Sequence, residues 1–347
     1  MYSYVVSGFS RTKTPASATP PGPGITHHES SESSMGADSS LQERVTSSRK
    51  DSYEHNDDRH WDIHGPGRGD DYRARTAAVR TCKRHGTAAH RVRPRPWLLP
   101  SSWDRWVNVF EDAGYTALTP GWPDDPVTVQ EANANPQVFA HKTVGQVADH
   151  FDTIVRGLSK KPAIIGHSFG GLLAQILAGR GLASASVAID PAPFRGVLPL
   201  PLSALKSAWP VLSNPANRNR AIPLTYEQFR FGFANAVSED EAKDLYETYA
   251  VPASGAPLFQ AATANFNPWT EAQVDTENPH RGPLLIISGE KDNTVPWAIA
   301  NASFKRQQRN PGVTEIVEMP NRGHALTVDS GWREVANTAL AFVKRYV

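Results

Sequence analysis

Cysteine is nearly absent from this sequence. Cys82 is the single cysteine among 347 residues, so an internal disulfide bond is excluded and a reducing compartment fits the composition. We therefore expect a cytoplasmic protein. The N-terminus does not change this expectation, because polar residues interrupt residues 1–10 and leave no apolar region of the kind that a signal peptide needs.

An excess of one charge and a long apolar run are also missing. The 36 Lys and Arg residues balance the 35 Asp and Glu residues, which gives a net charge of +1 at pH 7. This balance indicates neither nucleic acid nor an anionic membrane as a partner. No apolar run approaches the roughly 20 residues of a transmembrane helix, so we expect no membrane span.

Large apolar side chains are scarce in residues 1–95, where Ser, Pro, His and Arg are common instead. Such a segment cannot bury enough apolar surface to offset the entropy lost on ordering, and we predict that it is disordered. Five of its histidines lack the cysteines or the helical frame that would fix them as metal ligands, so no metal site is expected: His27, His28, His55, His60 and His64.

A regular alternation of apolar patterns begins near Trp97. Helices are expected where apolar residues recur at helical spacing, and strands where short apolar runs are bounded by turn residues. A polar loop is expected over residues 124–142. The alternation predicts an α/β domain over residues 96–347 with a doubly wound, mostly parallel sheet. The expected helices are 101–113, 144–155, 297–308 and 332–343, and the expected strands are 115–118, 163–165, 186–189, 284–287 and 313–317.

The stretch from Pro162 to Gly171 contains the pattern G-x-S-x-G, with Ser168 at its centre. An apolar run precedes the pattern and a helical pattern follows it. The chain is therefore expected to pass from strand to helix through a tight turn that exposes Ser168 at its tip. Small residues are needed around the serine because its backbone is strained and passes close to the adjoining strand and helix.

The strand–helix alternation stops between Ala192 and about His280. Prolines 199, 201 and 210 are expected to break the chain here, and aromatic residues cluster over residues 226–233. Ser238, with Glu241 three residues on, predicts a capping box at the start of a second helix. We interpret residues 192–280 as a helical insertion.

A serine hydroxyl is a weak nucleophile at neutral pH and needs a base and an orienting carboxylate. Ser168, Asp292 and His324 each follow a candidate strand, and the carboxyl ends of parallel strands meet at one sheet edge. Asp190 also ends a strand and is the alternative acid.

The residues around the acid, Gly289–Pro296, and the Gly-His pair at the base are similar to the corresponding motifs of the α/β-hydrolase superfamily. The chain resembles this superfamily, and most closely its compact bacterial members with a helical cap. The resemblance covers residues from about 97 to the C-terminus. It implies a Ser168–His324–Asp292 triad, a cap over the active site at residues 192–280, and no metal or organic cofactor.

The resemblance also implies an oxyanion hole with two backbone donors. The N–H of Phe169 is one. If the register follows Trp97, the family's His-Gly motif falls on Pro94 and Arg95, and Pro96 takes the second donor position without an N–H. The adjacent N–H of Trp97 is the remaining candidate. Arg91 and Arg93 are also poor residues for the buried strand expected over residues 88–93.

Two explanations of this departure are open. Either the protein is a degraded hydrolase with a new N-terminal extension, or residues 1–96 come from a wrong start or reading frame. The abrupt change of composition near Trp97 and the lost motif favour the second.

The expected reaction is hydrolysis of a carboxylic ester or a related acyl bond through an acyl-enzyme on Ser168. The aromatic insertion favours a small-molecule substrate with an apolar part. A cofactor-free haloperoxidase or a lyase with the same triad is the first alternative. A catalytically impaired protein is the second. The oligomeric state is not predicted.

Overall fold

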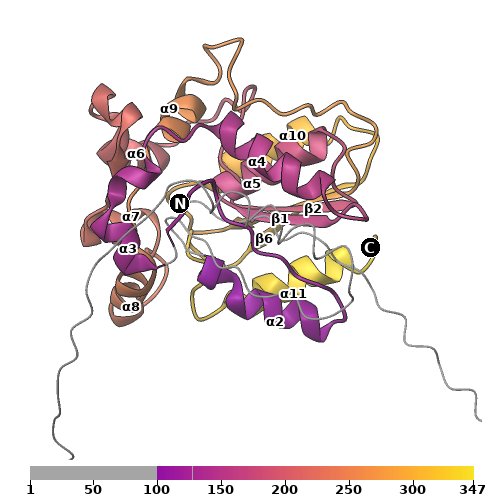
Figure 1. Cartoon of the computed structure of the whole chain (residues 1–347), viewed down its shortest axis with the longest axis horizontal. Coiled ribbons are helices and arrows are strands. Elements are labelled where there is room, and N and C mark those ends of the chain that lie inside the picture. The colour runs from indigo at the N-terminus through magenta and orange to yellow at the C-terminus, as the bar shows by residue number, and fades with distance from the viewer. Residues whose placement is uncertain (1–99, 127) are drawn as a thin grey trace, which may run out of the picture. The chain divides into compact units, whose positions relative to one another are not determined.

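The computed structural model describes residues 100–126 and 128–347 (Figure 1). The predictions for residues 1–95, for a strand at 88–93 and for the Trp97 donor lie outside the described residues.

The described residues form a four-stranded sheet whose strands pair in the order β1-β2-β5-β6. All three neighbouring pairs are parallel, with Ile165 opposite Val187 and Val187 opposite Leu285. The first three strands in this order are buried on both faces, as their continuous apolar runs predict. The parallel sheet is confirmed. Its strands are β1 (Ala163–His167), β2 (Ala185–Ile189), β5 (Leu284–Gly289) and β6 (Thr314–Met319).

The strand expected at residues 115–118 does not form a ladder in the described part of the chain, where Leu118 alone makes an isolated bridge. An apolar run becomes a strand only when a neighbouring strand pairs with it, and no described strand forms a ladder with this run.

Helices cover both faces of the sheet (Figure 1). One face carries α4 (Val144–Arg156), α5 (Phe169–Gly179) and α10 (Trp297–Gln307), and the other carries α2 (Asp104–Asp112) and α11 (Trp332–Val343). The helix at 144–155 is confirmed, and Thr143 and Gln146 close a capping box at its start. A 3-10 turn, η1 (Pro100–Trp103), precedes α2.

The polar loop expected over 124–142 is a wrong prediction in part, because it contains α3 (Val129–Ala134) and the 3-10 helix η2 (Pro136–Phe139). The side chain of Thr128 accepts from the N–H of Glu131, whose side chain in turn accepts from the N–H of Thr128. This reciprocal cap stabilises a helix with few apolar residues.

The segment between β2 and β5 is helical, as expected. A short antiparallel pair, β3 with β4, ties its two halves together. Pro210 does not end a helix but lies inside the last turn of α6. The elements are α6 (Leu202–Leu212), η3 (Pro215–Asn219), β3 (Ala221–Ile222), α7 (Tyr226–Gly232), α8 (Glu239–Tyr249), β4 (Ala253–Ser254) and α9 (Ala256–Thr263).

The capping box expected at α8 is half formed. Ser238 accepts from the N–H of Glu241, but the Glu241 carboxylate accepts from the N–H and hydroxyl of Ser330 instead of returning to Ser238. The side chain thus joins α8 to the loop before α11. Among the described helices, none is long and apolar enough to cross a bilayer.

Candidate active site

Ser168 lies at the sharp turn between β1 and α5. Its backbone has φ 57° and ψ −119°, a conformation that costs a non-glycine residue free energy and persists only where the surroundings enforce it. The Ser168 N–H donates to the carbonyl of Ile189, and its carbonyl accepts from the N–H of Ala192. A Cβ on Gly166 would lie 2.0 Å from the carbonyl oxygen of Gly170. Gly166, two residues before Ser168, must therefore be a glycine because β1 and α5 lie so close together.

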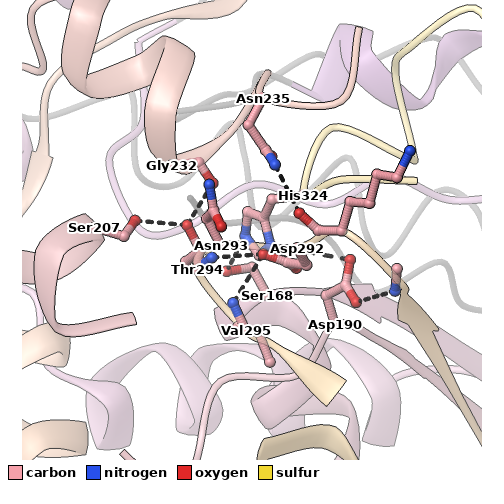
Figure 2. Close-up of polar contacts among 12 residues, drawn as sticks. Ser168, Asp190, Ser207, Gly232, Asn235, Asp292, Asn293, Thr294, Val295 and His324 are labelled. Atoms are coloured by element: carbon pink, nitrogen blue, oxygen red, sulfur yellow. Dashed lines mark hydrogen bonds and ion pairs between the residues drawn. The ribbon is translucent and has the colours of Figure 1, made fainter. Parts of the chain in front are cut away.

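His324 joins the hydroxyl of Ser168 to the carboxylate of Asp292. Its Nε2 is 3.0 Å from Ser168 Oγ, and its Nδ1 is 2.6 Å from Asp292 Oδ2 (Figure 2). All three side chains are buried. The structure therefore brings together the three residues that the sequence predicts, from the loops after β1, β5 and β6.

The Asp292 carboxylate is fixed by its own loop. Its Oδ1 accepts from the N–H of Thr294 at 2.6 Å and from that of Val295 at 2.9 Å, which leaves Oδ2 for His324. The hydroxyl of Thr294 donates to the carbonyl of Gly232 and accepts from Ser207 at 2.6 Å. The orientation of the acid is thus coupled to α6 and α7 of the insertion (Figure 2).

The sequence of the chain matches the profile of the alpha/beta hydrolase family over residues 85–338. The chain belongs to this family. The match begins before Trp97 and stops short of the C-terminus, so its limits differ from those expected from the motifs alone. A comparison with curated proteins finds no match.

Solved structures resemble this alpha/beta hydrolase at low sequence identity. A monoacylglycerol lipase of Paleococcus ferrophilus shares 19% identity with a TM-score of 0.48, covering 71% of this chain and 90% of its own. An extracellular alpha/beta-hydrolase of a Paenibacillus species shares 20% with a TM-score of 0.49, covering 71% and 94%. A variant of PytH shares 16% with a TM-score of 0.50, covering 71% and 93%, and this similarity concerns the fold alone.

Asp190, the alternative acid of the hydrolase, lies beside the triad but farther from the base. Its Oδ2 is 4.0 Å from His324 Nδ1, against 2.6 Å for Asp292. Its Oδ1 accepts from the N–H of Gly289 at 2.8 Å. Burial, followed by the neighbouring Asp292 carboxylate, raises the pKa of Asp190 well above its usual value. The geometry favours Asp292 over Asp190 as the partner of His324.

His167 packs its ring against that of His324, with ring centroids 4.6 Å apart. Burial and the nearby His324 hold the pKa of His167 well below its usual value, so the ring is neutral at pH 7. His167, Asp190 and His324 place nitrogen and oxygen atoms within 4.8 Å of one another. Both ring nitrogens of His324 already contact Asp292 and Ser168, so a metal ion there would have to displace one of those contacts.

Phe169, the predicted first oxyanion donor of the hydrolase, is the first residue of α5 and directly follows Ser168. The N–H groups of a helix's first turn point away from the helix and suit a developing negative charge. Trp97, the candidate for the second donor, lies outside the described residues, so the second donor stays a prediction.

A cavity of about 320 Å³ lies between the insertion and α3, and two aromatic rings near the site line it. Phe233 contacts the ring of His324 edge-on at 5.4 Å and stacks on Phe229 at 4.9 Å. Phe233, one of the aromatic residues predicted to pack the insertion, therefore both contacts the ring of His324 and lines this cavity. Its lining is Asn133, Pro223, Leu224, Phe229, Phe233, Tyr246, Glu247, Ala250 and Val251.

Sequence reasoning missed the supports of the acid. Thr294 follows Asp292 by two residues, and an Asp side chain in a loop commonly accepts from the backbone N–H two residues on, which is an Asx turn. That signal could have identified the Thr294 donor. The contact with Ser207 is 87 residues away along the chain, and no local pattern indicates it.

Proposed function

We propose that this alpha/beta hydrolase cleaves carboxylic esters through Ser168, His324 and Asp292. The observation that carries the proposal is the continuous contact from Ser168 Oγ to His324 Nε2 at 3.0 Å and from His324 Nδ1 to Asp292 Oδ2 at 2.6 Å. These distances are within hydrogen-bond reach, which is the geometric requirement for a base-activated nucleophile.

Each step follows from the position of these groups. His324 takes the proton of Ser168 as Oγ attacks the substrate carbonyl, and then gives it to the leaving alkoxide. Water hydrolyses the acyl-enzyme with His324 again as base. Asp292 accepts from Nδ1–H, which leaves Nε2 as the acceptor that faces Ser168. The N–H of Phe169 donates to the oxyanion.

The strain at Ser168 serves this chemistry. A serine with φ 57° stands outside both the strand and the helix that flank it, so Oγ faces the imidazole and not the core. Thr294 and Val295 hold Asp292 through its other oxygen. The three groups are therefore oriented before a substrate binds, which lowers the reorganisation that catalysis requires.

The cavity bounded by Phe229 and Phe233 supports a substrate with an apolar acyl or alcohol part. A volume of about 320 Å³ suits a small molecule, and the insertion that bears it would act as a cap over the triad. Glu247 and Asn133 in the lining offer polar contacts.

A fluorophosphonate probe tests the proposal, because it reacts only with an activated serine. We expect prompt labelling of the full chain, no labelling of Ser168→Ala, and unchanged labelling of Ser186→Ala, a buried serine of β2 outside the triad. Hydrolysis of p-nitrophenyl esters should follow the same pattern. A folded chain that does not label would support the impaired alternative, and halide-dependent oxidation without ester cleavage would support the haloperoxidase.

A further inference from the structure

Large apolar side chains are exposed on one part of the insertion. Among the described residues, seven large hydrophobic side chains are exposed, and six of them belong to two segments of the insertion. Phe266 is 88% exposed and Trp269 is 87% exposed. Exposed apolar residues gathered in this way mark an interaction site. We call this set the exposed apolar surface: Leu198, Leu200, Leu202, Trp209, Phe266 and Trp269.

The two segments that bear these side chains are joined by hydrogen bonds. The Asn265 side chain accepts from the N–H of Gly196 at 2.7 Å and donates to the carbonyl of Val197 at 2.9 Å. Arg195 donates to the carbonyl of Pro268 at 3.1 Å. The segment before α6 and the loop after α9 are therefore neighbours, and Figure 1 shows α6 and α9 close to each other at the same end of the molecule.

Helix α6 connects the exposed apolar surface to the candidate active site. Leu202, Lys206 and Trp209 follow one another at helical spacing and are exposed. The opposite face is buried, and its Ser207 donates to Thr294, whose N–H donates to Asp292. One face of α6 is thus turned to solvent while the other supports the acid.

Together, the two chain intervals that bear this surface contain basic residues but no acidic ones, and the exposed Glu271 follows directly after the second. No Asp or Glu occurs between Asp190 and Glu227, or between Glu247 and Glu271. The first interval contains four exposed basic residues that form no ion pair among the described residues, Arg195, Lys206, Arg218 and Arg220. Basic side chains next to exposed apolar side chains favour, as a binding partner, an amphiphile with an anionic head group over a neutral protein surface.

A polar hollow of about 270 Å³ adjoins the same loops and is lined by two arginines. Gly196 has φ +98°, and a Cβ there would lie 2.5 Å from the guanidinium of Arg306. The missing side chain lets Arg306 reach the hollow opposite Arg195. Two guanidinium groups with the amide of Gln273 suit a phosphate-type group.

We propose that the exposed apolar surface docks this hydrolase on a lipid–water interface that carries anionic head groups. Phe266, Trp269 and the leucines enter the interface, and Arg195 and Arg306 bind a head group. Docking would bring apolar esters to the cap directly from the lipid phase. Docking does not require the proposed ester chemistry, and the two are tested separately.

Co-sedimentation of the full chain with vesicles tests the proposal without any substrate. We expect binding to phosphatidylglycerol vesicles that weakens with salt, and weaker binding to phosphatidylcholine vesicles. The variant Trp209→Ser/Phe266→Ser/Trp269→Ser should bind at least about tenfold more weakly, because three aromatic side chains no longer enter the interface. Val313→Ser removes the one other exposed large hydrophobic of the described part and should bind like the parent.

The arginines give a second, independent measurement. Arg195→Gln/Arg306→Gln should lose the preference for phosphatidylglycerol while it keeps the weak binding to phosphatidylcholine. Circular dichroism and thermal unfolding establish that each variant is folded. Equal binding of the parent and the triple aromatic variant would overturn the proposal. So would a parent chain that ignores vesicles but forms a dimer that the aromatic variant cannot form, because the partner would then be a second copy.

Discussion

The carboxyl group of Asp190 is the most constrained acid of the site. It is fully buried, its backbone has φ 39°, and its Oδ1 accepts from the N–H of Gly289. Burial and the neighbouring Asp292 carboxylate raise the pKa of Asp190, which favours its protonated form, and in that form it is a donor toward the Asp292 carboxylate. His324 and His167, the other titratable groups that face it, lie on the loop after β6 and at the end of β1. Asp190 would then position Asp292 as a neutral acid and would not orient His324.

The substitution Asp190→Asn separates these two roles. Asparagine can still accept from Gly289 and donate to Asp292, so kcat/KM for a p-nitrophenyl ester should stay within about threefold of the parent. Asp190→Ala removes both contacts and should cost about tenfold or more. Asp292→Asn should cost on the order of 10² to 10⁴. If Asp190→Asn lost as much activity as Asp292→Asn, Asp190 would be the working acid.

Asp329, in the loop before α11, predicts a pH dependence of stability. Burial raises the pKa of Asp329 to about 6, against the opposing pull of Arg322. An unfolded Asp has a pKa of about 3.9. Between these values the folded state holds a proton that the unfolded state has lost. The stabilisation of the folded state by the protonated Asp329 carboxyl is therefore complete below about pH 4 and is lost as the pH rises through 6.

The measurement is the free energy of unfolding in urea for the parent and for Asp329→Asn. From pH 4 to pH 7, the free energy of unfolding of the parent should fall by up to ~3 kcal/mol relative to that of Asp329→Asn. Asp244→Asn, on the exposed face of α8, controls for the loss of one negative charge. A difference that stays constant with pH would show that Asp329 ionises alike in both states.

At the scale of the element, the turn between β1 and α5 has no room for a side chain at Gly166. Gly166→Ala would place a methyl group 2.0 Å from the Gly170 carbonyl oxygen, so the strand and helix would have to separate. We expect a loss of more than about 3 kcal/mol and no probe labelling at Ser168. Gly157→Ala, at the exposed end of α4 with φ −74°, should cost less than about 1 kcal/mol. A Gly166→Ala protein that unfolds and labels like the parent would contradict the tight turn.

The elements that sequence patterns predict best are those whose own residues carry the signal, even where the pairing partner is distant, as β5 is for β2. The strands β1, β2 and β5 have unbroken apolar runs, and α4 has both a cap and an apolar face. The strand expected at 115–118 has a weaker apolar signal and forms a single bridge residue in the described part of the chain. Helix α3 was missed because its signal is the Thr128–Glu131 cap and not an apolar face. The triad order was predictable, but the Ser207–Thr294 contact that steadies its acid joins two distant segments.

At the scale of the whole molecule, the net charge of the chain does not show how charge is distributed along it. A net charge of +1 for 347 residues indicates no anionic partner, yet the stretch between Asp190 and Glu227 has only basic charges. Exposure decides whether such a stretch can bind anything. Leu202 and Trp209 occupy the spacing of an ordinary buried helix face, and only the structure shows them exposed on α6.

The family match begins at residue 85 and so includes the stretch in which the His-Gly motif is missing. Arg93-Pro94-Arg95-Pro96 precedes Trp97 there. Arginine codons CGN and proline codons CCN, read one base later, become GNC and CNC. In this shifted frame the four codons become GNC, CNC, GNC and CNT, where the last T is the first base of the Trp97 codon. They can encode Val-His-Gly-Leu, and the leucine has the backbone N–H that proline lacks at the donor position. We predict that the coding DNA contains this reading.

Protein chemistry gives the matching prediction. The variant Arg93→Val/Pro94→His/Arg95→Gly/Pro96→Leu supplies the second oxyanion donor, and because one donor contributes on the order of 10² to 10³ in kcat, ester hydrolysis should rise by that factor. The same four changes combined with Ser168→Ala should give no activity, which ties any gain to the proposed nucleophile. Arg93→Val alone restores no donor and should leave kcat unchanged. If the four-residue variant is folded and gains nothing, and codons 93–96 do not read His-Gly one base on, the donor comes from elsewhere in the chain.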